Sequence, residues 1–162
     1  MAGRISYRQK YFENYDVICI AIGTNDYEIG TPIGNVVDTN VDTFYGALMY
    51  IVERIKEQNP KAKVVFITPF YRGRLLNERN INCNFKKNKL GYTLRDYADA
   101  IKAVADVHRY NVYDANEAGV ISLNNVSFST IDYIYPKEEY HGKIGCDMVD
   151  YFIKNKIIGP SN

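Results

Sequence analysis

The sequence predicts an α/β fold in which helices cover both faces of a parallel sheet. Three short apolar segments have the pattern of strands, and after each of them comes a segment with helical spacing of its apolar residues. This alternating order is typical of a parallel sheet with right-handed crossovers. Because the 162 residues show no repeat and no shift in composition, we expect one domain over residues 1–162.

The expected strands span residues 17–23, 63–69 and 111–114. The first two are continuous apolar runs, which are typical of strands buried on both faces. In parallel sheets, ligands bind beyond the carboxyl ends of the strands. We therefore expect a functional site in the segments that directly follow these three strands.

The expected helices span residues 40–59, 93–108 and 138–154. In the first, apolar residues recur at helical spacing and Pro60 follows the end. In the second, Thr93 stands where an N-cap is expected, ahead of a continuous apolar face. The third has a sparser apolar stripe.

The charge balance does not favour a nucleic-acid or membrane partner. Twenty Lys and Arg offset nineteen Asp and Glu, which leaves a net charge of +1 and no strong field to attract nucleic acid or an anionic membrane. The apolar runs are far shorter than the roughly 18 residues that cross a bilayer, and the first residues lack the order of a secretory signal. We expect a soluble chain, and its compartment stays open.

The three cysteines and two histidines predict no metal site. Cys19, Cys83 and Cys146 are widely spaced and form no Cys-x-x-Cys pair. Cys19 lies in an apolar segment and is expected in the core, whereas Cys83 lies in a polar loop and could be a free thiol. No cofactor is expected, and a flavodoxin-like small-molecule binder gains no support, because no glycine-rich phosphate loop follows any strand.

A polar phrase, Gly23-Thr24-Asn25-Asp26-Tyr27, directly follows the first expected strand. Taken alone it could be a tight turn, because glycine, asparagine and aspartate all favour turns. Together with the apolar strand before it, however, the phrase resembles the third sequence block of SGNH (GDSL-type) hydrolases. The resemblance extends over residues 15–152. Further phrases similar to this family follow in order at residues 32–34, 43–48, 59–69 and 93–97.

The resemblance implies a three-layer, flavodoxin-like SGNH hydrolase fold and an oxyanion role for Asn25. In this family the asparagine donates a side-chain hydrogen bond to the oxyanion of an ester's tetrahedral intermediate. An amide fixed at a strand end is a preorganised dipole, and one such donor is typically worth about 10² to 10³ in rate. Gly23, Thr24 and Asp26 form the loop around it, and Gly23 allows the sharp exit from the strand.

The family's last block, Asp-x-x-His-Pro, corresponds here to a segment that begins at Asp132 and ends at Pro136. The resemblance implies that Asp132 is the orienting aspartate and that Tyr135 occupies the position of the histidine base. A tyrosine, with an unperturbed pKa of about 10, is a poor proton acceptor at neutral pH. His141 is the other candidate for the base, and a surface or capping residue is the alternative interpretation of it.

The family's nucleophile is a serine in a Gly-Asp-Ser phrase well upstream of the oxyanion block. Only 22 residues precede Gly23, and the serine among them, Ser6, follows no buried strand. The resemblance thus implies a domain without its first strands and without the triad's serine and histidine. An open sheet edge would then lie beside residues 17–22. We expect residues 7–15, a second copy of the chain in a homodimer, or a missing N-terminal segment to cover it.

Residues 71–92 form a long and basic connection. This segment could form a wall of the substrate site and favour an anionic group, or it could be a solvated, mobile loop. Its six basic residues, set against Glu78 alone, are Arg72, Arg74, Arg79, Lys86, Lys87 and Lys89.

Two functions follow from the resemblance. The first is an ester hydrolase for acyl or acetyl esters, such as those on carbohydrate, with its serine supplied by polypeptide outside this sequence. The second is a non-catalytic descendant that binds a ligand such as a glycan, or a structural module of a larger assembly. An oxyanion hole and binding alone accelerate a reaction by only about 10³ to 10⁴ over water, whereas a working enzyme reaches at least roughly 10⁶. We therefore expect the isolated chain to be inactive.

Overall fold

The computed structural model describes residues 11–76 and 79–159, and its main sheet is parallel, as predicted. Three strands form it in the order β1-β2-β5, and each ends slightly earlier than the sequence predicted. These strands are β1 (Val17–Ala21), β2 (Lys63–Ile67) and β5 (Asn111–Tyr113). The predicted fold class is confirmed.

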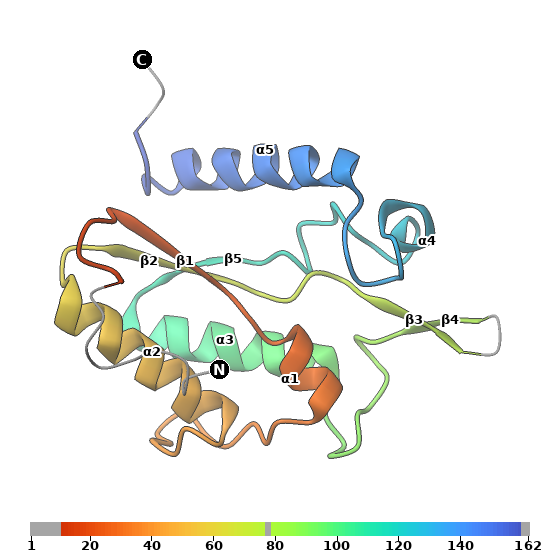
Figure 1. The fold of residues 1–162 in the computed structure, drawn as a ribbon, viewed down its shortest axis with the longest axis horizontal. Coiled ribbons are helices and arrows are strands. Elements are labelled where there is room, and N and C mark those ends of the chain that lie inside the picture. Colours follow the sequence, from red (N-terminus) through yellow and green to blue (C-terminus); the bar gives the residue numbers. More distant parts are fainter. Residues whose placement is uncertain (1–10, 77–78, 160–162) are drawn as a thin grey trace.

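Helices cover both faces of the sheet (Figure 1). One layer contains α2 (Phe44–Gln58) and α3 (Leu94–His108), and the other contains α5 (Glu138–Lys154). Threonine hydroxyls cap α2 and α3: Thr43 accepts a hydrogen bond from the backbone N–H of Gly46, and Thr93 accepts one from that of Asp96. Because Thr43 is the cap, α2 begins at residue 44, later than the predicted residue 40.

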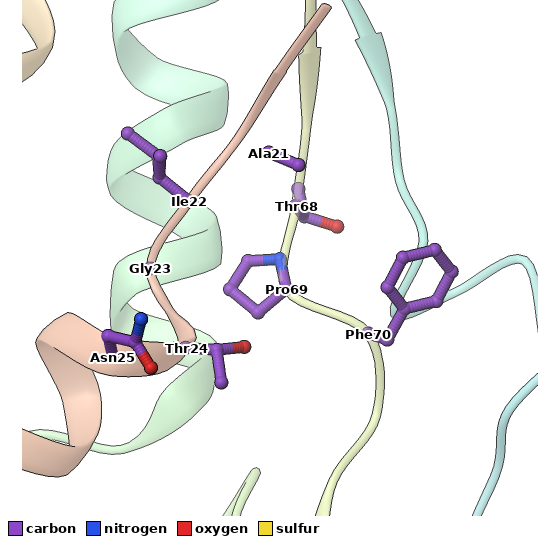
Figure 2. A pocket seen from close by; sticks show the side chains of 8 residues that line it. All are labelled: Ala21, Ile22, Gly23, Thr24, Asn25, Thr68, Pro69 and Phe70. Carbon is purple, nitrogen blue, oxygen red and sulfur yellow. The ribbon is translucent and has the colours of Figure 1, made fainter. Parts of the chain in front are cut away.

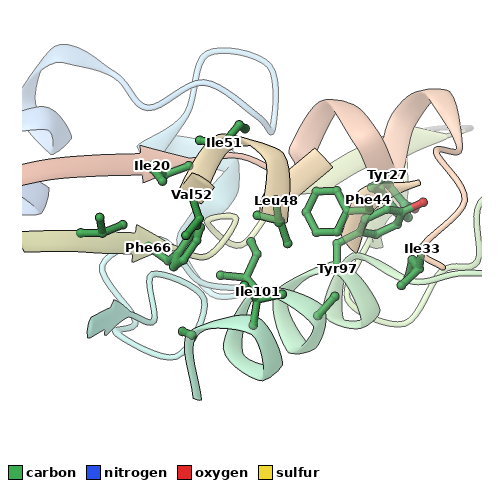
Figure 3. Packing of buried hydrophobic residues seen from close by; sticks show 14 of the residues in the cluster. Ile20, Tyr27, Ile33, Phe44, Leu48, Ile51, Val52, Phe66, Tyr97 and Ile101 are labelled. Carbon is green, nitrogen blue, oxygen red and sulfur yellow. The ribbon is translucent and has the colours of Figure 1, made fainter. Parts of the chain in front are cut away.

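Tyr97 of α3 is fully buried and connects several segments inside the larger core cluster (Figure 3). Its ring meets those of Phe44 and Tyr27 edge-on, with centroids 5.1 Å and 6.4 Å away. Its hydroxyl donates a hydrogen bond to the carbonyl of Thr31 at 2.6 Å. The segment that follows β1 is therefore fixed against α3.

The strand β1 is buried on one face only, which corrects the prediction that both of its faces are buried. Ile18 and Ile20 belong to the core shared with α2 and α3, whereas Cys19 and Ala21 are exposed. On the other side of the sheet, α5 packs mainly on β2 and β5, for example through Met148. Cys19 is therefore not the core residue that was expected.

The residues that lead into β1 are attached to the end of α2. The side-chain amide of Asn59 donates hydrogen bonds to the carbonyls of Phe12 at 3.0 Å and Tyr15 at 2.9 Å. Residues 1–10, which include Ser6 and the first part of the segment expected to cover the sheet edge, lie outside the described residues. How the edge of β1 is covered stays a prediction.

The basic segment after β2 contains an antiparallel hairpin that the sequence did not predict. Its strands are β3 (Gly73–Leu76) and β4 (Arg79–Asn82). Cys83 follows β4 and is a free thiol, as the sequence suggested, but it is fully buried although the residues around it in the sequence are polar. The backbone N–H of Cys83 donates to the carbonyl of Arg72, and its carbonyl accepts from the N–H of Leu94, which ties the segment to α3.

Two short helices also went unpredicted, because neither is long enough to show an apolar stripe. They are α1 (Thr24–Ile29) and α4 (Val126–Ser129). Within residues 11–76 and 79–159, none of the helices has the length and apolar character needed to span a membrane.

The first turn of α2 leaves no room for a side chain at Gly46. A Cβ there would lie 2.0 Å from the carbonyl oxygen of Asn40. We expect Gly46→Ala to lower the free energy of unfolding by about 1–3 kcal/mol through overpacking. Gly142→Ala in α5 is the matched control, because nothing lies within 4 Å of that Cβ, and it should raise the free energy by about 0.5–1 kcal/mol. Urea denaturation measures both, and effects of the same sign would contradict the close contact.

Candidate functional site

The residues after β1 turn the chain sharply into α1. Gly23 has a φ of 108°, in the left-handed region that glycine adopts without steric cost. A Cβ at this position would lie 2.8 Å from Cγ of Pro69. Because Gly23 has no side chain, the segments after β1 and β2 can approach each other. The chain reversal at Gly23 then places Asn25 in the first turn of α1.

A pocket of about 130 Å³ lies beyond the ends of β1 and β2 (Figure 2). Thr24 and Asn25 border it from α1, and Thr68 and Pro69 border it from the segment after β2. The complete lining consists of Ala21, Ile22, Gly23, Thr24, Asn25, Thr68, Pro69 and Phe70. The pocket occupies the edge of the sheet at which the sequence predicted a site.

A larger cavity, of about 420 Å³, brings Asn25 together with Asp132 and Tyr135. Its lining consists of Asn25, Glu28, Arg72, Gly73, Asp132, Ile134 and Tyr135. Since Asn25 borders both pockets, the two are neighbours. The side chains offer an amide, carboxylates, a guanidinium and a phenol, which can bind carbonyl and hydroxyl groups of a ligand. In the described part of the chain, no three His, Cys, Asp or Glu side chains are grouped to hold a metal ion.

Asp132 shapes the turn that carries Tyr135. Its Oδ1 accepts hydrogen bonds from the backbone N–H groups of Ile134 at 3.1 Å and Tyr135 at 2.9 Å. Tyr133 has a φ of 66°, a left-handed conformation that costs a non-glycine residue of order 1–3 kcal/mol. The carbonyl of Tyr133 accepts a hydrogen bond from the N–H of Gly73 at 2.9 Å. The turn is therefore attached to the start of β3.

Arg72 of the basic segment is a buried cation that borders the larger cavity. It is 3% exposed, and its Nη2 donates to Oε2 of Glu28 at 2.8 Å. Its Nη1 donates to the carbonyl of Thr24 at 3.3 Å. Sequence reasoning missed Glu28, which follows Asn25 by three positions. That spacing puts both on one side of a helix, but the signal depends on recognising α1.

The other predicted site residues lie outside the larger cavity. Thr24 borders the smaller pocket, and Oδ1 of Asp26 accepts a hydrogen bond from the Thr31 hydroxyl at 3.1 Å. His141 is exposed in the first turn of α5, and its Nε2–H donates to the carbonyl of Pro136 at 3.1 Å. His141 borders neither of these two pockets, and its role stays a prediction.

Asp114 fixes the segment that follows β2. Its Oδ1 accepts a hydrogen bond from the Thr68 hydroxyl at 2.9 Å, and its Oδ2 pairs with the ammonium of Lys102. Burial alone would raise the pKa of Asp114, but the hydrogen bonds from Lys102 and Thr68 outweigh it, and the pKa is lowered. Because Thr68 borders the smaller pocket, this network sets the position of one of its walls.

Comparison with known proteins identifies the family. The model of the GDSL-like lipase/acylhydrolase family matches residues 2–141. The chain belongs to this family. Membership confirms the resemblance that the residue 23–27 phrase carries. Among curated proteins, none matches the chain.

Solved structures similar to this member of the GDSL-like family share its fold. A possible lipase from Chitinophaga pinensis is 22% identical, with a TM-score of 0.74 over 88% of this chain and 74% of that one. A protein from Lactobacillus plantarum is 24% identical, with a TM-score of 0.76 over 88% and 68%. Another structure, 23% identical with a TM-score of 0.76, is matched over 86% of this chain and 64% of its own length. The chain thus spans 64–74% of these three structures.

The turn at Asp132 can be tested through stability. We expect Asp132→Ala to lower the free energy of unfolding by about 1–2 kcal/mol, because two backbone N–H groups lose their acceptor. Asp132→Asn keeps an oxygen in the same place and should cost less. Urea denaturation distinguishes the two variants, and equal losses would show that the hydrogen bonds to Oδ1 do not stabilise the turn.

The lowered pKa of Asp114 predicts a pH dependence of stability. The ionised carboxylate of Asp114 contributes to the free energy of unfolding. This contribution is complete above the unfolded pKa of 3.8 and is lost as the pH falls through the lower pKa of the folded state. We expect Asp114→Asn to be less stable than the native chain at pH 7, with a difference that shrinks as the pH falls below about 4. Denaturant midpoints over this range measure the difference. A difference that grows toward low pH would contradict the assigned direction.

Proposed function

We propose that this chain is an SGNH-type domain that binds acyl or acetyl esters, including acetyl esters of carbohydrate. The observation that carries the proposal is the cavity of about 420 Å³ that Asn25 shares with Asp132 and Tyr135. Its volume lies within the range of about 300–1,000 Å³ found for small-molecule sites. Similarity in fold to an acetyl xylan esterase, 18% identical with a TM-score of 0.58 over 84% of this chain and 66% of that one, supports an acetylated carbohydrate as the ligand.

Asn25 is the group that would meet the ester carbonyl. Its side chain is exposed at the start of α1 and borders both pockets. The turn at Gly23 fixes the backbone of Asn25 from one side, and the contact of Arg72 with the carbonyl of Thr24 fixes it from the other. Because the backbone is fixed, the side-chain amide is confined to positions beside the two pockets, from which it can donate to a carbonyl oxygen that develops negative charge.

Hydrolysis would also need a nucleophile and a base. The described residues that border the two pockets include no serine, cysteine or histidine. Tyr135 stands at the position of the family's histidine, and a phenol is a poor base at neutral pH. In this proposal, hydrolysis by the family's mechanism needs a serine from polypeptide outside this sequence, and the isolated chain does not turn esters over.

A second function is a non-catalytic module that uses the same cavity to bind a glycan or to join a larger assembly. Tyr135 favours this non-catalytic function. The residue is 60% exposed, borders the cavity and offers an aromatic face and a hydroxyl to a sugar. The two functions share a ligand class and differ in turnover. Binding and turnover experiments therefore separate them.

Binding of an acetylated ligand tests the ester site. We expect acetylated xylo-oligosaccharides to bind more tightly than their deacetylated forms, and Asn25→Ala to reduce this preference by about three- to tenfold through the loss of one hydrogen bond. Asn14→Ala, at an exposed asparagine before β1, is the matched control and should leave the preference unchanged. Isothermal titration calorimetry measures the affinities. Equal affinity of the native chain for both ligands would contradict the proposed ester site.

Turnover of p-nitrophenyl acetate separates the two functions. We expect the native chain, Asn25→Ala and Tyr135→His all to match the buffer rate, because restoring a base does not supply a nucleophile. Turnover by the native chain that Asn25→Ala abolishes would contradict the non-catalytic function and would place the nucleophile within this chain.

A further inference from the structure

Three lysines after β4 gather around a pocket next to the proposed ester site. The pocket has a volume of about 210 Å³, and its lining consists of Tyr27, Glu28, Lys86, Lys87, Asn88 and Lys89. Glu28 also borders the larger cavity that contains Asn25. A ligand in the larger cavity could therefore extend past Glu28 into this lysine pocket.

Hydrogen bonds hold the backbone that carries the lysines. The side-chain amide of Asn88 donates to the carbonyl of Tyr27 at 3.0 Å and to the hydroxyl of Tyr97 at 3.1 Å, and its oxygen accepts from the N–H of Tyr92. The hydroxyl of Tyr27 donates to the carbonyl of Lys86 at 3.1 Å. These contacts attach the segment to α1 and α3, so the lysines extend from a built wall and not from an unattached loop.

The stem of Lys89 lies directly over Gly30. A Cβ at Gly30 would be 2.7 Å from Cε and 2.9 Å from Cγ of Lys89. Gly30 ends α1 with a φ of 71°. The aliphatic part of Lys89 thus packs across the end of α1, and the same residue borders the pocket.

The positive charge of this pocket is not neutralised by acidic neighbours. Among the described residues, Lys86, Lys87 and Lys89 take part in none of the ion pairs. Glu28, the acidic residue of the lining, is already paired with the buried Arg72 at 2.8 Å. A concave surface with several like charges focuses its potential. Three lysines that line one pocket therefore favour an anion.

We propose that the lysine pocket is a subsite for an anionic group, a carboxylate or a phosphate, on the molecule that carries the ester. The proposal rests on the ester site at Asn25 and adds the charge of the ligand. Lysine ammonium groups act as compact point charges without the fixed fork geometry of arginine. The subsite therefore selects for negative charge more than for the shape of the anion, and the ligand class becomes esters of acidic sugars or sugar phosphates.

Three matched monosaccharides test the subsite by itself. Glucose, glucuronate and glucose 6-phosphate share a ring and differ in the charge at one end. We expect at least one of the two anions to bind about tenfold more tightly than glucose at low salt, with the advantage falling severalfold at about 0.3 M NaCl because exposed charges are screened. Titration followed by amide shifts in ¹H–¹⁵N spectra measures affinity and locates binding at residues 86–89. Affinities equal to that of glucose for both anions would overturn the proposal, and the stronger anion identifies the ligand chemistry.

Charge reversal supplies the matched comparison. Lys87→Glu and Lys89→Glu should each remove most of the preference for the anion, whereas Lys61→Glu should change it less than about twofold. Lys61 is exposed before β2, at the opposite end of the strand from the pockets, and its replacement changes the net charge by the same amount. An equal loss in all three variants would mean attraction by net charge alone and would overturn the subsite.

The Asn25→Ala variant keeps the two proposals separate. If the ester site alone is wrong, Asn25→Ala leaves the affinity for acetylated ligands unchanged while the lysine variants still lose the preference for the anion. If the lysine subsite alone is wrong, Asn25→Ala weakens binding of acetylated ligands while the lysine variants bind glucuronate and glucose 6-phosphate as the native chain does.

Discussion

The parallel pairing of β1 with β2 is the constraint on which the candidate site depends. Ala21 pairs with Ile67, so both strands end at the same level and the segments that follow leave the sheet side by side. Gly23 and Pro69 meet directly beyond these ends, in a contact that excludes a Cβ at Gly23. The chain then turns at a positive φ into α1. The position of Asn25 thus follows from strand register and from one glycine.

The buried charge of Arg72 joins this turn to the rest of the site. A cation with almost no solvent contact needs compensating partners, since a buried charge left alone costs several kcal/mol. Glu28 and the carbonyl of Thr24 supply them, and both belong to α1. The residue after Arg72, Gly73, donates to the carbonyl of Tyr133. Segments from three distant parts of the sequence are therefore fixed around one cavity by the side chain of Arg72 and the backbone N–H of the residue that follows it.

Features with a local, periodic signal could be predicted from the sequence, and features set by tertiary packing could not. The strands, the longer helices and the Thr93 cap have such signals, and the family resemblance led to Asn25. The exposure of Cys19 depends on which strands α5 covers, and the burial of Cys83 depends on a hairpin whose short strands leave little pattern. The pairing of Arg72 with Glu28 required knowing that α1 is a helix. The charge of residues 71–92 alone did not show that Arg72 is buried and paired whereas Lys87 and Lys89 are exposed.

Asn25 and Asp132 differ in what the fold itself requires of them. Oδ1 of Asp132 holds two backbone N–H groups of a turn that contains a left-handed tyrosine. A structural role therefore accounts for an aspartate there, whether or not a histidine follows, and its presence does not by itself indicate catalysis. The Asn25 side chain makes no hydrogen bond to the described residues and is exposed in the first turn of α1. Hydrogen bonds within the fold thus account for Asp132 but not for Asn25, which agrees with the ligand-binding role proposed for Asn25.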